Sequence, residues 1–290
     1  IISMKSTIAA TNLTLEQQIG QKLMLDFRYY CEKSSKKKCR KPMTELPKDL
    51  AQTIAQHNIG GVILFAENID NVAQIVKLNN QMQQAAAKST LGAPLFISID
   101  QEGGRVARIP RHIGTSFTGN MSIGATYPKH GTKFATQSAH VIADELKAIG
   151  VNVNFAPTID VNINPDNPVI NVRSYSEDPT LVGILGGAQV AAFEDNAVIT
   201  SLKHFPGHGD TNIDSHTGLP RVEHDKNTIW QQDLPPFKDI IKSQNPGMIM
   251  TAHIQYPALD DSTFVSKDGK TMIKPATMSR KIITDLLRGE

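Results

Sequence analysis

Apolar and polar positions follow two alternating rhythms along this chain. Short runs of consecutive apolar residues are typical of strands that are buried on both faces. Such runs predict strands at residues 22–27, 60–65, 93–100, 151–159, 197–202 and 247–252. Between them, apolar residues recur at steps of three and four, which indicates one buried face of a helix. Helices are predicted at residues 50–57, 72–82, 132–149, 181–193, 232–243 and 279–288.

Strands that alternate with helices predict a parallel α/β fold. Polar residues follow several of the predicted strands, namely Asp26, Asp100-Gln101-Glu102, Asp160, Lys203-His204 and His253. A doubly wound sheet gathers such residues at one switch point, whereas a TIM-type (β/α)8 barrel distributes them over the carboxyl ends of many strands. The even distribution therefore favours the TIM-type barrel.

The number of strands departs from that fold, because six are predicted and the barrel has eight. Six units would leave open sheet edges. We therefore expect residues 13–290 to be a (β/α)8-barrel catalytic domain that lacks its last two β/α units. Any second, C-terminal domain would also be missing, and residues 1–12 would form an N-terminal extension.

Residues 203–216 hold three histidines, two aspartates and a lysine directly after a predicted strand. Proline and two glycines exclude a regular helix or strand here, and loops held by rigid scaffolds often carry catalytic residues. His204, His208, Asp210, Asp214 and His216 could instead bind a divalent metal. That set fits a helical metalloprotease motif poorly, since Pro206 and the glycines intervene. A further alternative assigns His208 and Asp210 a structural role in the loop.

This stretch resembles the signature of β-N-acetylglucosaminidases of glycoside hydrolase family 3, in which a Lys-His pair precedes Pro-Gly-His-Gly and then Asp-Ser-His. The matching residues are Lys203, His204, Pro206, Gly207, His208, Gly209, Asp214, Ser215 and His216. The resemblance covers nearly the whole chain from Thr14. It includes residues 250–253 and 275–279.

The resemblance implies that His216 is the general acid/base and that Asp214 orients it. An Asp paired with a His fixes the tautomer of the imidazole and raises its pKa, which suits a group that gives and takes a proton. Most retaining glycosidases use a carboxylic acid for this step. The resemblance also places Lys203 and His204 against the sugar hydroxyls.

Two further stretches supply candidate substrate residues. Asp100 and Arg108 combine a carboxylate with a guanidinium, which can hold neighbouring hydroxyls, and a phosphate loop is disfavoured because no Gly-Lys-Ser/Thr follows. The resemblance assigns both residues to the sugar, with a structural ion pair as the alternative. The loop at 162–175 is rich in turn-forming residues. In the resembling family its Arg, here Arg173, contacts the sugar; a structural Arg is the alternative.

The family implies a retaining exo-β-N-acetylglucosaminidase that removes terminal N-acetylglucosamine from muropeptides or chitooligosaccharides, with no cofactor or metal. Its nucleophile is an Asp on the strand after the 279–288 helix, and we expect that residue beyond Glu290. The alternatives are a β-glucosidase or a phosphorylase of the same family, and an inactive sugar-binding protein.

Composition changes this picture little. The net charge of +2 gives no reason to propose a nucleic-acid partner, and no apolar run approaches the ~18 residues of a membrane span. Cys31 and Cys39 bracket a lysine-rich stretch and favour a small-loop disulfide over two free thiols. A disulfide indicates an oxidising compartment, so we expect a periplasmic or secreted protein, with a cytoplasmic one as the alternative.

Overall fold

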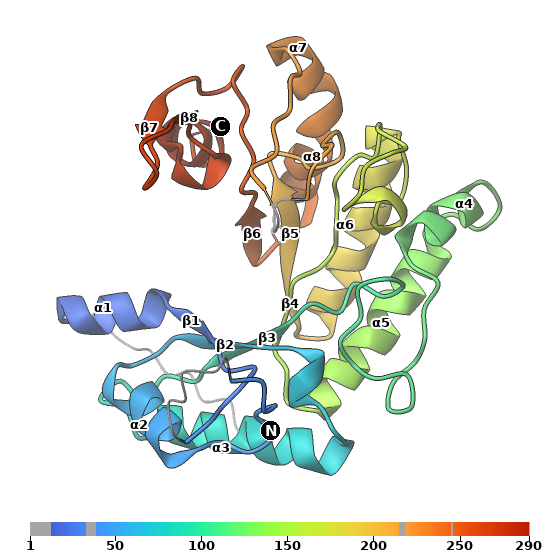
Figure 1. Cartoon of the computed structure of the whole chain (residues 1–290). Helices are drawn as coiled ribbons and strands as arrows, with labels where there is room; N and C mark the ends of the chain where they lie inside the picture. Colours follow the sequence, from blue (N-terminus) through green and yellow to red (C-terminus); the bar gives the residue numbers. More distant parts are fainter. Residues whose placement is uncertain (1–12, 33–38, 215–217, 245, 290) are drawn as a thin grey trace. The chain divides into compact units, whose positions relative to one another are not determined.

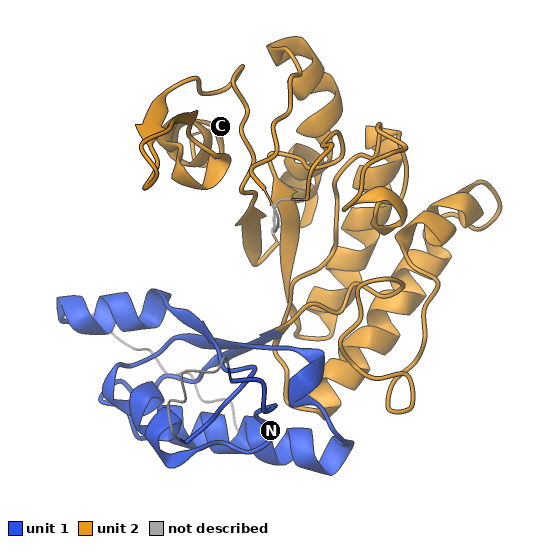
Figure 2. Cartoon of the chain, in the orientation of Figure 1, with its two compact units in different colours: residues 1–98 blue, residues 99–290 orange. Residues whose placement is uncertain are grey.

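We describe the fold from a computed structural model (Figure 1), in which residues 13–32, 39–214, 218–244 and 246–289 are described. The chain forms two compact units, one up to Ser98 and one from Ile99 onward (Figure 2). Each alternates strands with helices, as the apolar rhythm predicts. Within the described residues, no helix is both long and apolar enough to cross a bilayer.

The first unit contains α1 (Leu15–Lys22), β1 (Met24–Asp26), α2 (Lys48–Gln56), β2 (Gly61–Leu64), η1 (Ala66–Asn68), α3 (Val72–Ala87) and β3 (Phe96–Ile99), whose last residue begins the second unit. A capping box starts α1, because Thr14 and Gln17 each accept a hydrogen bond from the backbone of the other. Strands β1 and β2 are parallel. Apolar side chains of β2 and α3 are fully buried, which anchors the helix on the strands.

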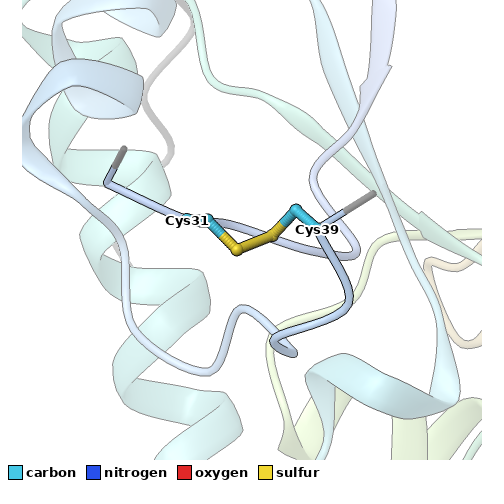
Figure 3. The surroundings of a disulfide bond; sticks show 2 residues. All are labelled: Cys31 and Cys39. Carbon is cyan, nitrogen blue, oxygen red and sulfur yellow. A yellow bond between two sulfur atoms is a disulfide. The ribbon is translucent and has the colours of Figure 1, made fainter. Parts of the chain in front are cut away.

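Cys31 and Cys39 form a disulfide in the segment between β1 and α2 (Figure 3). Their Cα atoms are 6.0 Å apart, within the ordinary range for a disulfide. The crosslink joins residues 8 positions apart and so closes a small loop.

The second unit contains α4 (Asn120–His130), α5 (Lys133–Ala148), β4 (Val153–Asn154), η2 (Asn171–Arg173), α6 (Pro179–Asp195), β5 (Ile199–Phe205), α7 (Lys226–Thr228), η3 (Ile229–Asp233), α8 (Pro235–Gln244), β6 (Met248–Thr251), β7 (Thr263–Val265), β8 (Thr271–Ile273), η4 (Ala276–Met278) and η5 (Lys281–Leu286). Strands β4, β5 and β6 are parallel neighbours. Helix α6 packs between α5 and α8 (Figure 1). A core of buried aliphatic and aromatic residues fills the space between these helices and strands.

Two strand boundaries differ from the prediction, and both differences affect the candidate site. The expected strand at 151–159 is regular only over β4, because Pro157 has no N–H to donate to a neighbouring strand. Conversely, β5 runs on to Phe205, so that Lys203 and His204 lie within the strand. Backbone hydrogen bonds explain the extension: the Lys203 N–H donates to Pro157 and its carbonyl accepts from Ile159.

The sequence pattern did not predict α4 or the antiparallel hairpin of β7 and β8. Helix α4 lacks a clear apolar stripe, and hairpin strands of three residues are too short to show a period. The expected helix at 279–288 is regular only over η5. Ser279 precedes it, and the Ser279 hydroxyl accepts from the backbone N–H of Ile282.

Candidate active site

The polar residues that follow successive strands meet in the second unit. Asp100 directly follows β3, Arg173 ends η2, and Lys203 lies in β5. The Nζ of Lys203 donates to Asp100 Oδ1 at 2.8 Å, and Arg108 Nη2 lies 4.0 Å from Asp100 Oδ2. The candidate substrate residues are thus brought together from segments up to 103 positions apart.

Glu102 also belongs to this cluster, although its place in the sequence did not predict a role for it. Its Oε1 lies 2.6 Å from Lys203 Nζ. Arg173 donates to both of its oxygens, through Nε at 2.9 Å and Nη2 at 2.7 Å. The side chains of Glu102 and Lys203 are each only 2% exposed. Burial alone would raise the pKa of Glu102, but the charges of Lys203 and Arg173 and their hydrogen bonds lower it to about 2.

A second buried carboxylate, that of Asp160, orients His204. Asp160 follows the short β4 and accepts from the backbone N–H of His204 at 3.0 Å and from that of His208 at 2.8 Å. Its other oxygen lies 2.7 Å from His204 Nδ1. Burial raises the pKa of Asp160, but the neighbouring His204 outweighs burial, so that this pKa is below its ordinary value. An ionised Asp160 fixes the proton on Nδ1 and leaves Nε2 of His204 to contact a ligand.

Burial separates the supporting groups from those that can reach a ligand. Glu102 and Asp160 are buried, whereas Asp100, Arg108 and His204 are partly exposed. The Nε of Arg108 is buried and bonds to no described residue. One carboxylate, one guanidinium and one imidazole are therefore each accessible to a ligand. These groups accept and donate hydrogen bonds at fixed positions, which suits a ligand with several neighbouring hydroxyls.

The loop after β5 is held at its start by several contacts. The Tyr256 hydroxyl donates to the Gly207 carbonyl at 2.7 Å, and Asn167 Nδ2 donates to the His208 carbonyl at 2.8 Å. His208 is buried, and burial lowers its pKa. Asp210 lies 2.8 Å from His224, a residue that the sequence analysis did not single out.

Asp214 is half-buried, and its carbonyl accepts from the Gly218 N–H at 3.0 Å. His216, the expected acid/base, lies outside the described residues, so that the expected Asp214–His216 dyad stays a prediction. Among the residues that are described, no group of three or more His, Cys, Asp or Glu side chains could hold a metal ion.

Glu102 and Asp160 carried one signal that could have identified them. Both belong to the polar residues that follow predicted strands. Their roles could not be assigned from that position, because the pattern gives neither burial nor partners. His224 and Asp233 carried no such signal, since both lie outside the strand ends.

Comparison with known proteins identifies the family. A family model described as the glycosyl hydrolase family 3 N-terminal domain matches residues 14–290. β-Hexosaminidase A of Pseudoalteromonas piscicida is 63% identical over 292 residues, which cover 100% of this chain and 49% of that protein. The β-hexosaminidase of Tolumonas auensis is 34% identical over 246 residues, with 85% of this chain and 67% of that protein covered.

Solved structures agree with this result. The glycoside hydrolase family 3 β-N-acetylglucosaminidase from Paenibacillus sp. str. FPU-7 matches with a TM-score of 0.82 at 40% identity, covering 96% of this chain and 47% of that one. Native NagZ from Neisseria gonorrhoeae matches with a TM-score of 0.75 at 29% identity, covering 92% and 69%. The chain thus spans about half the length of the Pseudoalteromonas and Paenibacillus proteins. Because the family model matches nearly all of its residues, this chain belongs to glycosyl hydrolase family 3.

Proposed function

We propose that the protein is a retaining exo-β-N-acetylglucosaminidase that removes terminal β-linked N-acetylglucosamine from muropeptides or chitooligosaccharides. The observation that carries this proposal is that Asp100, Arg108 and His204 are partly exposed while buried groups hold two of them. Lys203, paired with Glu102, holds Asp100, and Asp160 holds His204. The names of the relatives, β-hexosaminidase and β-N-acetylglucosaminidase, support the same activity.

In the proposed reaction, Asp100, Arg108 and His204 hold the hydroxyls of the terminal sugar. The nucleophile is an Asp on the strand that follows residues 279–288 in the family pattern. Its carboxylate attacks the anomeric carbon, and the bond to the leaving oxygen breaks as His216 gives that oxygen a proton. Water then gives a proton to His216 and attacks the same carbon, which frees the nucleophile. Two displacements at one carbon retain its configuration.

The proposal extends to the fold and the compartment. We infer that the parallel β/α units belong to a (β/α)8 barrel completed by two further units, as the expected nucleophile strand requires. We also infer an extracytoplasmic location. The Cys31–Cys39 disulfide supports it, because disulfides persist in oxidising compartments.

The test uses the full-length protein with 4-nitrophenyl N-acetyl-β-glucosaminide and the matching β-glucoside. We expect turnover of the first, little of the second, and a β-configured product by NMR. His216→Ala should lower kcat by about a hundredfold or more. His130→Gln changes an exposed histidine of α4 and should leave the rate unchanged.

Four results would overturn this proposal. Equal rates for His216→Ala and the unmodified enzyme would remove the dyad from the mechanism. Preference for the glucoside would indicate a β-glucosidase, and dependence of the rate on phosphate a phosphorylase. Binding of N-acetylglucosamine without turnover would indicate an inactive sugar-binding protein.

A further inference from the structure

His224 lies between two carboxylates and contacts both at once. Its Nδ1 is 2.8 Å from Asp233 Oδ2, and its Nε2 is 2.8 Å from Asp210 Oδ2. The Asp233 side chain is almost fully buried, whereas that of Asp210 is 34% exposed. One end of this bridge is therefore fixed in the interior, and the other end can be released into solvent.

The buried end belongs to the scaffold. Asp233 is the last residue of η3, and a side chain at Gly207 would lie 3.2 Å from both the Cβ of Asp233 and the hydroxyl of Tyr256. Asp233 and Tyr256 thus pack against the backbone at the start of the loop. This packing makes Asp233 a rigid support for the imidazole of His224.

The exposed end belongs to the loop that carries the proposed dyad. Asp210 precedes Asp214 by a few residues in the segment that follows β5. Between them, Asn164 Nδ2 donates to Asn212 Oδ1 at 2.8 Å on the exposed surface. On the far side, the Val222 N–H donates to the Gln255 carbonyl. Among the described residues, the Asp210–His224 contact is thus a charged attachment of the loop close to Asp214.

The chemistry of imidazole makes this attachment depend on protonation. A neutral imidazole has one N–H, so it can donate to only one of the two carboxylates, whereas an imidazolium donates to both. When the ring is neutral, the buried Asp233 holds the proton on Nδ1. The Nε2 lone pair then faces the Asp210 carboxylate, and the two repel each other.

The charged groups around the ring favour the imidazolium. Asp233 of η3, Asp210 of the loop and the adjacent Asp225 are all acidic. The hydrogen bond with Asp233 raises the pKa of His224 above its ordinary value of 6.5, although partial burial opposes this. The bridge is therefore complete below pH 6.5 and is lost as the pH rises through the raised pKa.

We propose that His224 is a positioning residue that bridges Asp210 to Asp233 as an imidazolium. The bridge holds the loop after β5 that carries Asp214 in place for the reaction, and it releases that loop when His224 loses its proton. The catalytic part of this inference rests on the proposed hydrolase function. The groups that hold the sugar are supported separately by Glu102 and Asp160, so that the bridge should affect turnover more than binding.

The bridge itself can be tested without any activity, by NMR titration of histidine-labelled full-length protein. We expect the pKa of His224 to lie above 6.5, and to fall in Asp210→Asn because one negative charge is removed. If His224 titrates at or below 6.5, or if Asp210→Asn leaves its pKa unchanged, the bridging imidazolium is refuted.

Kinetics then test positioning, with His130→Gln as the matched control. His224→Gln should lower kcat by about tenfold to a hundredfold with KM within about twofold, because a misplaced catalytic group costs rate rather than affinity. In Asp210→Asn the amide can donate to the unprotonated Nε2 and keep the bridge closed. In the unmodified protein, kcat should decline as the pH rises through the measured pKa of His224. This decline should be absent in Asp210→Asn.

The outcomes separate this inference from the proposed function. If the unmodified protein turns over the aryl substrate and both variants keep its kcat and pH profile, the positioning role is refuted and the hydrolase function stands. If the unmodified protein shows no turnover, both the proposed function and the positioning role fail. The NMR titration still tests whether His224 bridges the two carboxylates as an imidazolium. If circular dichroism shows that His224→Gln is unfolded, the pH profile of Asp210→Asn decides positioning.

Discussion

Replacing Glu102 by Gln is expected to destabilise the protein strongly, because this carboxylate compensates two buried cations. Gln keeps the shape but removes the charge that faces Lys203 and Arg173. A carboxyl whose pKa falls from 4.5 to about 2 has its ionised form stabilised by about 3 kcal/mol. Removing one partner of a buried ion pair costs about 3–5 kcal/mol, which is the same order. We therefore expect Glu102→Gln to lower the free energy of unfolding by about 3 kcal/mol at neutral pH.

The pH dependence makes the prediction specific. Because the folded-state pKa of Glu102 is depressed, its contribution is present above the unfolded value of 4.5 and is lost as the pH falls toward about 2. Urea unfolding of both proteins, followed by circular dichroism at pH 7 and pH 3, measures this difference. At pH 3 the gap between them should shrink to about half or less, since Glu102 of the unfolded chain binds a proton there while Glu102 of the folded protein is still mostly ionised.

Glu223→Gln provides the matched control. Glu223 also pairs with an arginine, Arg221, but its side chain is 71% exposed. Exposed pairs contribute little, so that this variant should show no measurable loss of stability. A loss for Glu102→Gln that is no larger than the loss for Glu223→Gln, or that is the same at both pH values, would refute the reasoning.

Three further changes have defined outcomes. Asp160→Asn leaves the tautomer of His204 unfixed, and we expect kcat/KM for the aryl N-acetylglucosaminide to fall about tenfold to a hundredfold, the size of a lost charged hydrogen bond; an unchanged value would argue against the orienting role. Gly209→Ala would place a methyl group onto the Val161 carbonyl oxygen, so its melting temperature should fall well below that of Gly183→Ala, whose added Cβ would sit 3.7 Å from its nearest neighbour; equal melting temperatures would contradict this. Removing the disulfide by Cys31→Ser with Cys39→Ser should cost about 2–3 kcal/mol in urea unfolding, because the bond closes a loop between residues 8 positions apart. A reducing agent should reproduce that loss in the unmodified protein, and no effect of the reducing agent would count against it.

Much of this protein follows from local sequence. The spacing of apolar residues predicts the alternation of strands and helices. Residues that face the core recur at steps of three and four in a helix, whereas a strand buried on both faces is a short continuous apolar run. Thr14 and Gln17 mark the start of α1, since a capping box needs only residues three positions apart. The signature at 203–216 identifies the family from consecutive residues alone.

The supporting groups depended on the tertiary structure. Lys203 contacts Asp100, 103 positions away in the sequence, and Arg173 contacts Glu102, 71 positions away. The spacing of apolar and polar residues predicts only local structure, so it could not pair these residues. Burial turns Glu102 and Asp160 from two of many polar residues into carboxylates that fix the groups around them. The bridge through His224 likewise exists only where η3 and the loop after β5 meet. Sequence determines which groups a chain carries, and packing determines which of those groups lie away from water and near enough to act on one another.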